Sequence, residues 1–132
     1  MQAYAGRVQV IFAVNDVERT VRFYEDAFGW PRNDRIGFEN YVELLPPDGG
    51  SVGFYERGGF AAEVGADPVA VDGEQVAPAY LYVRVDDVDS ATAKLAEAGA
   101  RPLSPLTSRA WGERAAWFAD PDGNVVAVAQ PA

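Results

Sequence analysis

The sequence contains an internal repeat, which constrains the fold more than any single residue does. Residues 14–18 (VNDVE) closely resemble residues 85–89 (VDDVD). Each segment follows an apolar run, at 8–14 and at 80–85, that is rich in β-branched and aromatic residues, as a buried strand is. A repeat of this kind indicates that the chain folds as two copies of one structural unit.

A helical pattern follows each copy of the repeat. Apolar residues recur at helical spacing in both halves: Val17, Val21, Tyr24 and Phe28 in the first, and Val88, Ala91, Leu95 and Ala98 in the second. Asn15 and Asp86 are the predicted N-caps, since a short polar side chain there can accept a free backbone N–H. Gly29 and Gly99 are predicted to end the helices, because glycine adopts the left-handed conformation needed there.

Short strands and turns rich in proline and glycine complete each half, so each half predicts a strand, a helix and three further strands. The expected fold class is α+β, with one domain over 1–132 made of two tandem βαβββ modules. We place module one at about 7–60 and module two at about 79–130. The intervening residues 61–78 contain acidic residues and no Lys or Arg, and are expected to form a surface linker.

The order and spacing of these segments resemble the vicinal-oxygen-chelate superfamily, the class of glyoxalases, bleomycin resistance proteins and dioxygenases. The segments that carry the resemblance are 15–18, 23–24, 28–30, 95–99, 111–112 and 120–124. The resemblance covers nearly the whole chain and implies that the two modules form an eight-stranded open cup. It also implies a homodimer, since many members dimerise. A shared fold does not dictate a shared function.

In enzymatic members of that superfamily, four side chains on the cup floor hold a divalent metal. The resemblance places the corresponding positions at Gln9, Tyr80, Ala127 and either Phe54 or Gly53. Only Gln9 offers a usable donor, because the phenol of Tyr80 is ordinarily protonated and the other side chains have no donor atom. The chain also contains no His and no Cys. We therefore expect neither a metal nor another cofactor, as in the metal-free branch of the superfamily.

Alternation along the strands is expected to turn several side chains toward the cup, with a loop tryptophan at its rim. The predicted ligand-binding residues are Gln9, Ile11, Phe54, Glu56, Tyr80, Tyr82 and Trp111. Aromatic walls with a few polar groups are typical of small-molecule pockets. The alternative is that the same aromatic rings fill the cup and leave no cavity. Trp30 and Trp117 lie in better-defined elements and are predicted to be core residues.

Two of these residues leave alternatives open. The amide of Gln9 needs a hydrogen-bond partner if it is buried, and a ligand, a water molecule or a neighbouring side chain would each serve. Trp111 lies in a turn-rich segment, where it would either cover the cup and stack on a ligand or pack against the rim or a second subunit.

The net charge is −9, with 20 acidic against 11 basic side chains. Such a charge repels phosphate backbones and anionic membranes, which argues against nucleic acid and membrane partners and favours a cationic ligand. Acidity that serves solubility alone is the alternative. No apolar run approaches the ~20 residues that span a bilayer, and the N-terminus lacks a signal-peptide pattern, so a cytoplasmic location is expected.

Three functions are compatible with these patterns. The first is metal-free binding of a small hydrophobic or aromatic ligand, such as the sequestration of an antibiotic or metabolite. The second is a metal-independent lyase or isomerase with Glu43 or Glu56 as the base and Gln9 or Tyr80 as the hydrogen-bond donor. The third is a structural or regulatory dimer with a closed cup. An open pocket favours the first, a buried carboxylate beside a polar donor the second, and a filled cup the third.

Overall fold

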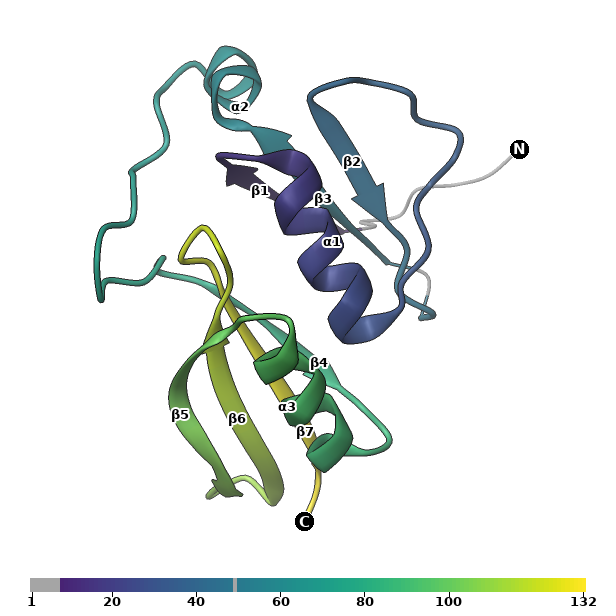
Figure 1. Cartoon of the computed structure of the whole chain (residues 1–132), viewed down its shortest axis with the longest axis vertical. Coiled ribbons are helices and arrows are strands. Elements are labelled where there is room, and N and C mark those ends of the chain that lie inside the picture. Colours follow the sequence, from purple (N-terminus) through teal and green to yellow (C-terminus); the bar gives the residue numbers. More distant parts are fainter. Residues whose placement is uncertain (1–7, 49) are drawn as a thin grey trace. The chain divides into compact units, whose positions relative to one another are not determined.

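The computed structural model describes residues 8–48 and 50–132, and Figure 1 shows their ribbon. In chain order the elements are β1 (Gln9–Val14), α1 (Val17–Phe28), β2 (Tyr41–Leu44), β3 (Ser51–Glu56), α2 (Arg57–Val64), β4 (Tyr80–Arg84), α3 (Val88–Glu97), β5 (Arg101–Ser108), β6 (Glu113–Ala119) and β7 (Val125–Pro131). Among the described residues, no helix has both the length and the apolar character needed to cross a membrane.

The described residues form two compact units. Residues 8–21 and 30–68 belong to unit 1, and residues 22–29 and 69–132 belong to unit 2. The boundary falls within α1, whose first residues belong to unit 1 and whose remainder belongs to unit 2.

Unit 1 contains a three-stranded sheet in the order β1-β3-β2, with β1 parallel and β2 antiparallel to β3. Paired residues share a face of the sheet, because side chains alternate along each strand. Phe54 pairs with Phe12 on β1 and with Val42 on β2, and the Phe54 ring is fully buried. Ile11 pairs with Gly53, which places both on the opposite face.

The described residues form seven strands, where the sequence predicts eight. The sequence predicts a strand after the first helix, but residues there make only isolated bridges, Arg32 with Leu44 and Phe38 with Tyr41. Pro31 has no backbone N–H to donate to a sheet. Asn33 then turns the chain, accepting the N–H of Arg35 on its side chain and the N–H of Ile36 on its carbonyl. Module one is therefore βαβββ-like, with a bridge in place of one strand.

Unit 2 contains a four-stranded sheet in the order β4-β7-β6-β5, in which β4 is parallel to β7 and the other pairs are antiparallel. Helix α3 contacts β5, β6 and β7. Leu95 on α3 is fully buried, as are Val126 and Val128 on β7. This is the predicted strand, helix and three strands of the second module.

The helix ends agree with the sequence at one end and differ at the other. Gly29 and Gly99 have positive φ angles of 69° and 92°, which confirms that they end α1 and α3. The N-caps are each one residue later than predicted. The carboxylate of Asp16 accepts the N–H of Arg19, and that of Asp87 accepts the N–H of Ser90.

Helix α2 is absent from the sequence prediction, which assigns residues 61–78 to a linker. The helix directly follows β3 and ends at Gly65, whose φ is 86°. Glu56 caps its start by accepting the N–H groups of Gly58 and Gly59. The two glycines are poor helix formers and hide the pattern, so the cap and the packing against β1 and β3 stabilise this helix.

Candidate functional site

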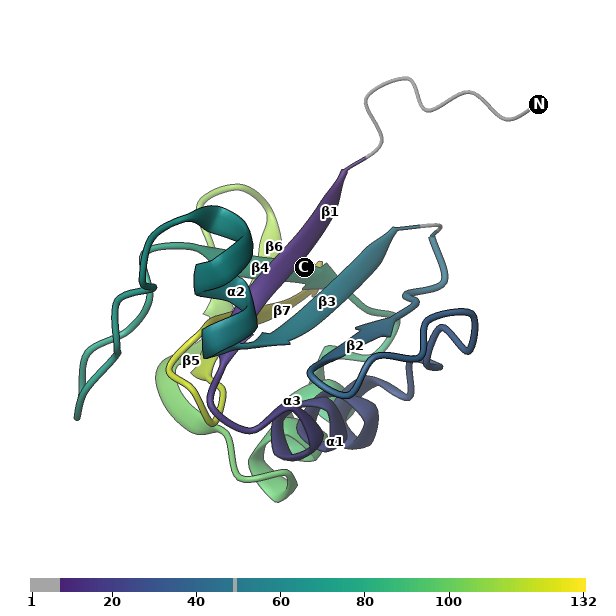
Figure 2. The ribbon, with the colours of Figure 1, turned by 90° about the horizontal axis from the view of Figure 1, so that it is seen from above.

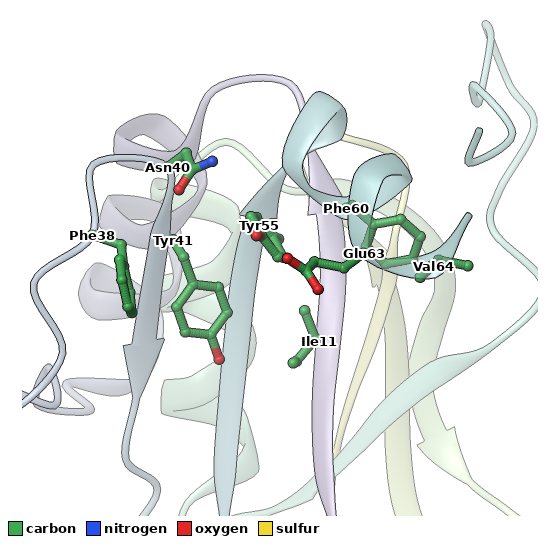
Figure 3. A pocket seen from close by; sticks show the side chains of 8 residues that line it. All are labelled: Ile11, Phe38, Asn40, Tyr41, Tyr55, Phe60, Glu63 and Val64. Carbon is green, nitrogen blue, oxygen red and sulfur yellow. The ribbon is translucent and has the colours of Figure 1, made fainter. Parts of the chain in front are cut away.

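A pocket of about 550 Å³ lies on the sheet of unit 1. Figure 3 shows the side chains that line it: Ile11, Phe38, Asn40, Tyr41, Tyr55, Phe60, Glu63 and Val64. The volume falls within the range of pockets that hold drug-sized molecules, roughly 300–1,000 Å³. The lining is mostly apolar, as in most small-molecule sites.

The strand register determines which residues form the floor of this pocket. Ile11 on β1, Tyr55 on β3 and Tyr41 on β2 share one face, because Tyr41 pairs with Tyr55 and Ile11 pairs with the adjacent alternate residue Gly53. The Tyr41 and Tyr55 rings meet edge to face, with centroids 5.4 Å apart and an interplanar angle of 70°. Their contact fixes two aromatic surfaces side by side.

Helix α2 supplies one wall of the pocket, and Figure 2 shows the helix beside β1 and β3. Phe60, Glu63 and Val64 reach the pocket from this helix. A side chain at Gly59 would overlap the Tyr55 ring, so glycine lets the helix approach the sheet this closely. Arg57 secures the start of the helix through a 2.7 Å hydrogen bond from its Nε to Oδ1 of Asn15.

The Tyr41 hydroxyl is the centre of a polar cluster beneath the pocket. It accepts a 2.8 Å hydrogen bond from Nε2 of Gln9, and the Glu43 carboxylate lies beside it on the same face of β2. Glu43 is 9% exposed. Burial, and then the adjacent Glu43 carboxylate, raise the pKa of Tyr41 to about 12, so its phenol is neutral at physiological pH. Space for the ring exists because Gly53 has no side chain beneath it.

The structure brings only part of the predicted ligand set to this pocket. Ile11 lines it, and Gln9 reaches it indirectly by holding Tyr41, which makes a neighbouring side chain the partner of Gln9. Phe54 and Glu56 are on the other face, contrary to the prediction. Phe54 packs in the core with Phe12, at a centroid distance of 6.1 Å, and Glu56 is occupied as the cap of α2.

The other predicted residues form a separate aromatic cluster in unit 2. Tyr80, Tyr82 and Trp111 all surround Trp117, with ring-centroid distances of 5.8, 6.2 and 6.2 Å. Trp117 is half-buried in this cluster, rather than in the core as predicted, whereas Trp30 is buried as predicted. Tyr80 is 54% and Trp111 56% exposed, so the cluster presents aromatic surface.

Hydrogen bonds hold Trp111 in place. Its indole N–H donates to the Tyr82 hydroxyl at 2.9 Å, and that hydroxyl donates to Oε1 of Glu113 at 2.7 Å. The indole also contacts Trp117 edge to face. Of the two alternatives for Trp111, this geometry favours packing against its own unit over a mobile cover.

Two guanidinium groups already occupy ring faces in the unit 2 cluster. Arg84 lies over Tyr82 at 5.0 Å and Arg109 over Trp117 at 4.8 Å. Arg84 also forms a salt bridge with Glu113, with 2.9 Å between Nε and Oε2. Hydrogen bonds from Arg84, and then from Tyr82, hold the pKa of Glu113 below its usual range. The chain therefore supplies this cluster with its own cations.

Sequence reasoning missed most of the residues that line the pocket. The sequence contains a signal for Tyr41 and Tyr55. Tyr41 lies two residues from Glu43, and Tyr55 two residues from Gly53, so each pair shares a face of a predicted strand. If Gly53 rather than Phe54 is taken as the last-strand metal-ligand position, strand alternation places Tyr55 on the cup face. The lining residues on α2, such as Phe60 and Glu63, have no comparable signal in the sequence, because the apolar pattern does not predict this helix.

The residues at the four metal-ligand positions do not fit a divalent cation. The amide of Gln9 is engaged by Tyr41, Gly53 offers no donor, and Ala127 is fully buried without one. Tyr80 contributes only a phenol. Within the described residues, no group of three or more His, Cys, Asp or Glu side chains is arranged to hold a metal. The donor set at these positions therefore does not support a metal-dependent step.

Comparison with known proteins defines the class. The model of the Glyoxalase/Bleomycin resistance protein/Dioxygenase superfamily matches residues 6–128. The chain belongs to this superfamily, which confirms the resemblance found in the sequence. It is 31% identical to the uncharacterized protein YraH of Bacillus subtilis (strain 168) over 124 residues, covering 92% of this chain and 94% of YraH.

Solved structures share the fold over nearly the full length. A glyoxalase/bleomycin resistance protein/dioxygenase family enzyme from Burkholderia phytofirmans PsJN matches with a TM-score of 0.79 and 18% identity, over 94% of this chain and 97% of that one. A protein of unknown function from Agrobacterium tumefaciens str. C58 matches with a TM-score of 0.75 and 26% identity, over 100% and 98% of the two chains. These likenesses support the fold and leave the function to the site.

Proposed function

We propose that this protein binds a small, mainly apolar or aromatic molecule without a metal and sequesters it. The observation that carries the proposal is the pocket of about 550 Å³ on the unit 1 sheet. Burial of apolar ligand surface against its rings provides the main driving force, at roughly 25 cal/mol per Å² before the cost of association. An open pocket also argues against the closed-cup alternative.

The chemistry of the pocket favours binding over reaction. Four of its lining side chains are aromatic, namely Phe38, Tyr41, Tyr55 and Phe60. The neutral phenol of Tyr41 can donate or accept a hydrogen bond, and the amide of Asn40 can do both. Such groups orient a ligand, and none of them is a strong nucleophile.

Binding is tested by titrating drug-sized anthracycline and quinone-type compounds and following their own fluorescence or absorbance. Tyr55→Ala should weaken binding by about 1–3 kcal/mol, because it removes an aromatic anchor from the pocket floor. Tyr80→Ala and Trp111→Ala are the matched variants in the unit 2 cluster, and a loss of affinity there would add that cluster to the site. If no compound binds below about millimolar concentration, the proposal is wrong.

A metal-independent lyase or isomerase is the second candidate, and the Tyr41–Glu43 pair favours it. Glu43 is a buried carboxylate beside the pocket-lining phenol of Tyr41, and could receive a proton from a bound substrate through that hydroxyl. Glu56, the other predicted base, is excluded from this role by its place at the N-cap of α2.

Mass spectrometry of a bound compound recovered after prolonged incubation separates the two candidates. Recovery of the unchanged compound supports sequestration. Conversion that is lost in Glu43→Gln and retained in Glu56→Gln supports the enzyme.

A further inference from the structure

Glu63 is the only charged side chain among the described residues that line the pocket. It lies on α2, and Figure 3 shows its carboxylate extending from the helix toward Tyr55 and Ile11. Within the described part of the chain, Glu63 has no hydrogen-bond or ion-pair partner. An acidic group is thus presented to the pocket with its acceptor oxygens available to a ligand.

The surroundings of Glu63 reinforce a negative potential in the pocket. No Lys or Arg is among the described lining residues, so nothing basic there neutralises the carboxylate. The aromatic faces of Tyr41 and Tyr55 attract cations through their quadrupoles. Glu43 lies beneath Tyr41 and adds a second carboxylate on the same side of the sheet.

Unit 2 provides a contrast within the same chain. There the faces of Tyr82 and Trp117 are covered by the guanidinium groups of Arg84 and Arg109. The acidic group of that cluster, Glu113, is paired with Arg84. In the unit 1 pocket, no described lining residue places a cation over the rings or pairs with the Glu63 carboxylate. A ligand can therefore take both roles.

We propose that Glu63 makes the unit 1 pocket selective for protonated amines that carry an aromatic or aliphatic body. The ammonium group donates hydrogen bonds to the Glu63 carboxylate, while the body packs on Tyr41, Tyr55 and Ile11. This inference rests on the proposed function and adds the charge of the ligand and the residue that recognises it. The overall acidity of the chain contributes to long-range attraction, whereas Glu63 provides the local contact.

The test uses three compounds with the same ring system and different charges: 1-naphthylmethylamine, 1-naphthylmethanol and 1-naphthoate. Each is titrated at neutral pH and low salt, with binding followed by amide shifts in NMR spectra of the wild type. The proteins compared are the wild type, Glu63→Gln and Glu97→Gln. Glu97 is exposed on α3 and is not among the described lining residues, so its replacement removes the same charge without changing the pocket lining.

Because Glu63 is exposed, the amine should bind the wild type about three- to fivefold more tightly than the alcohol, and the carboxylate should bind most weakly. Glu63→Gln should remove most of the advantage of the amine and leave the affinity for the alcohol within about twofold. Glu97→Gln should leave the preference intact. Added salt should weaken binding of the amine more than that of the alcohol.

Equal affinities for amine and alcohol, or an equal loss in Glu63→Gln and Glu97→Gln, would overturn the role of Glu63 and leave the pocket as a neutral binding site. If none of the three compounds shifts signals of pocket residues, both the role of Glu63 and the proposed function fail. The two failures are distinguishable, because the alcohol reports on the apolar pocket independently of charge.

Discussion

The phenol of Tyr41 lies in the space that Gly53 leaves free on the neighbouring strand, and a side chain at position 53 would overlap it. This relationship sets the floor of the pocket, because Tyr41 lines the pocket and its hydroxyl accepts the hydrogen bond from Gln9. Gly53, one of the two candidates for the last-strand metal-ligand position, therefore has no side chain, and the Tyr41 ring from β2 occupies that space.

The first prediction follows from this overlap. Gly53→Ala should lower the free energy of unfolding by about 1–3 kcal/mol, because the added methyl group displaces Tyr41 from a packed position. Urea denaturation measures the change. In a Tyr41→Ala background, the same Gly53→Ala substitution should cost much less, since the overlapping ring is gone. Equal costs in both backgrounds would contradict the proposed packing.

A second prediction concerns Asp120, which is buried and accepts a 2.7 Å hydrogen bond from the Tyr24 hydroxyl. Burial raises the pKa of Asp120 from 3.8 to about 6, so the folded protein binds this proton more tightly than the unfolded chain. The Asp120 contribution to the free energy of unfolding should therefore decrease as pH rises from about 4 to about 6, by roughly 3 kcal/mol in total.

Asp120→Asn tests this expectation, because an amide keeps the shape and cannot ionise. The stability of Asp120→Asn relative to the wild type should therefore increase across this pH range. Urea denaturation at several pH values provides the measurement. A difference between Asp120→Asn and the wild type that does not vary with pH would show that Asp120 does not titrate in this way.

The third prediction concerns the anchoring of Trp111. Tyr82→Phe removes the hydroxyl that connects the Trp111 indole to Glu113, so Trp111 should become more mobile. The stability change should stay below about 1 kcal/mol, since the contact is partly exposed. ¹⁹F NMR of fluorotryptophan-labelled protein can follow all 3 tryptophans. Only the Trp111 signal should sharpen appreciably, and Tyr80→Phe should leave it unchanged.

Homodimerisation is the fourth prediction. β1 and β4 each lie at the edge of their own sheet, and Val10 and Tyr80 on these strands are exposed. Unprotected strand edges promote association, and symmetric pairing is the commonest way to cover them. Light scattering at micromolar concentration should give about twice the chain mass of 14.2 kDa. A mass near that of one chain would contradict the prediction.

Most of the fold could be predicted from the sequence because the repeat and the apolar periodicity reflect burial directly. Tyr24 and Leu95 are fully buried at the positions that their helical stripes indicate. The missing strand depends on something more local, since Pro31 and the Asn33 turn reduce it to a bridge. Apolar patterning does not resolve such a competition between turn formation and strand pairing.

The candidate site is less predictable, because strand alternation changes every assignment when the register shifts by one residue. Placing the last-strand position at Phe54 instead of Gly53 assigns a core residue to the cup and leaves Tyr55 out. Glu63 depends on α2, which forms through capping by Glu56 and the close approach at Gly59. These are tertiary effects with no periodic signal.

The central claim is that the unit 1 pocket binds a small molecule, and chemical-shift mapping with the tightest compound from the titrations tests it most directly. We predict saturable shifts concentrated at Ile11, Tyr41, Tyr55 and Phe60, with much smaller changes around Trp117. The same compound added to Tyr55→Ala should give weaker, unsaturated shifts. Saturable shifts confined to the unit 2 cluster, or no saturable shifts with any compound of the panel, would contradict the claim.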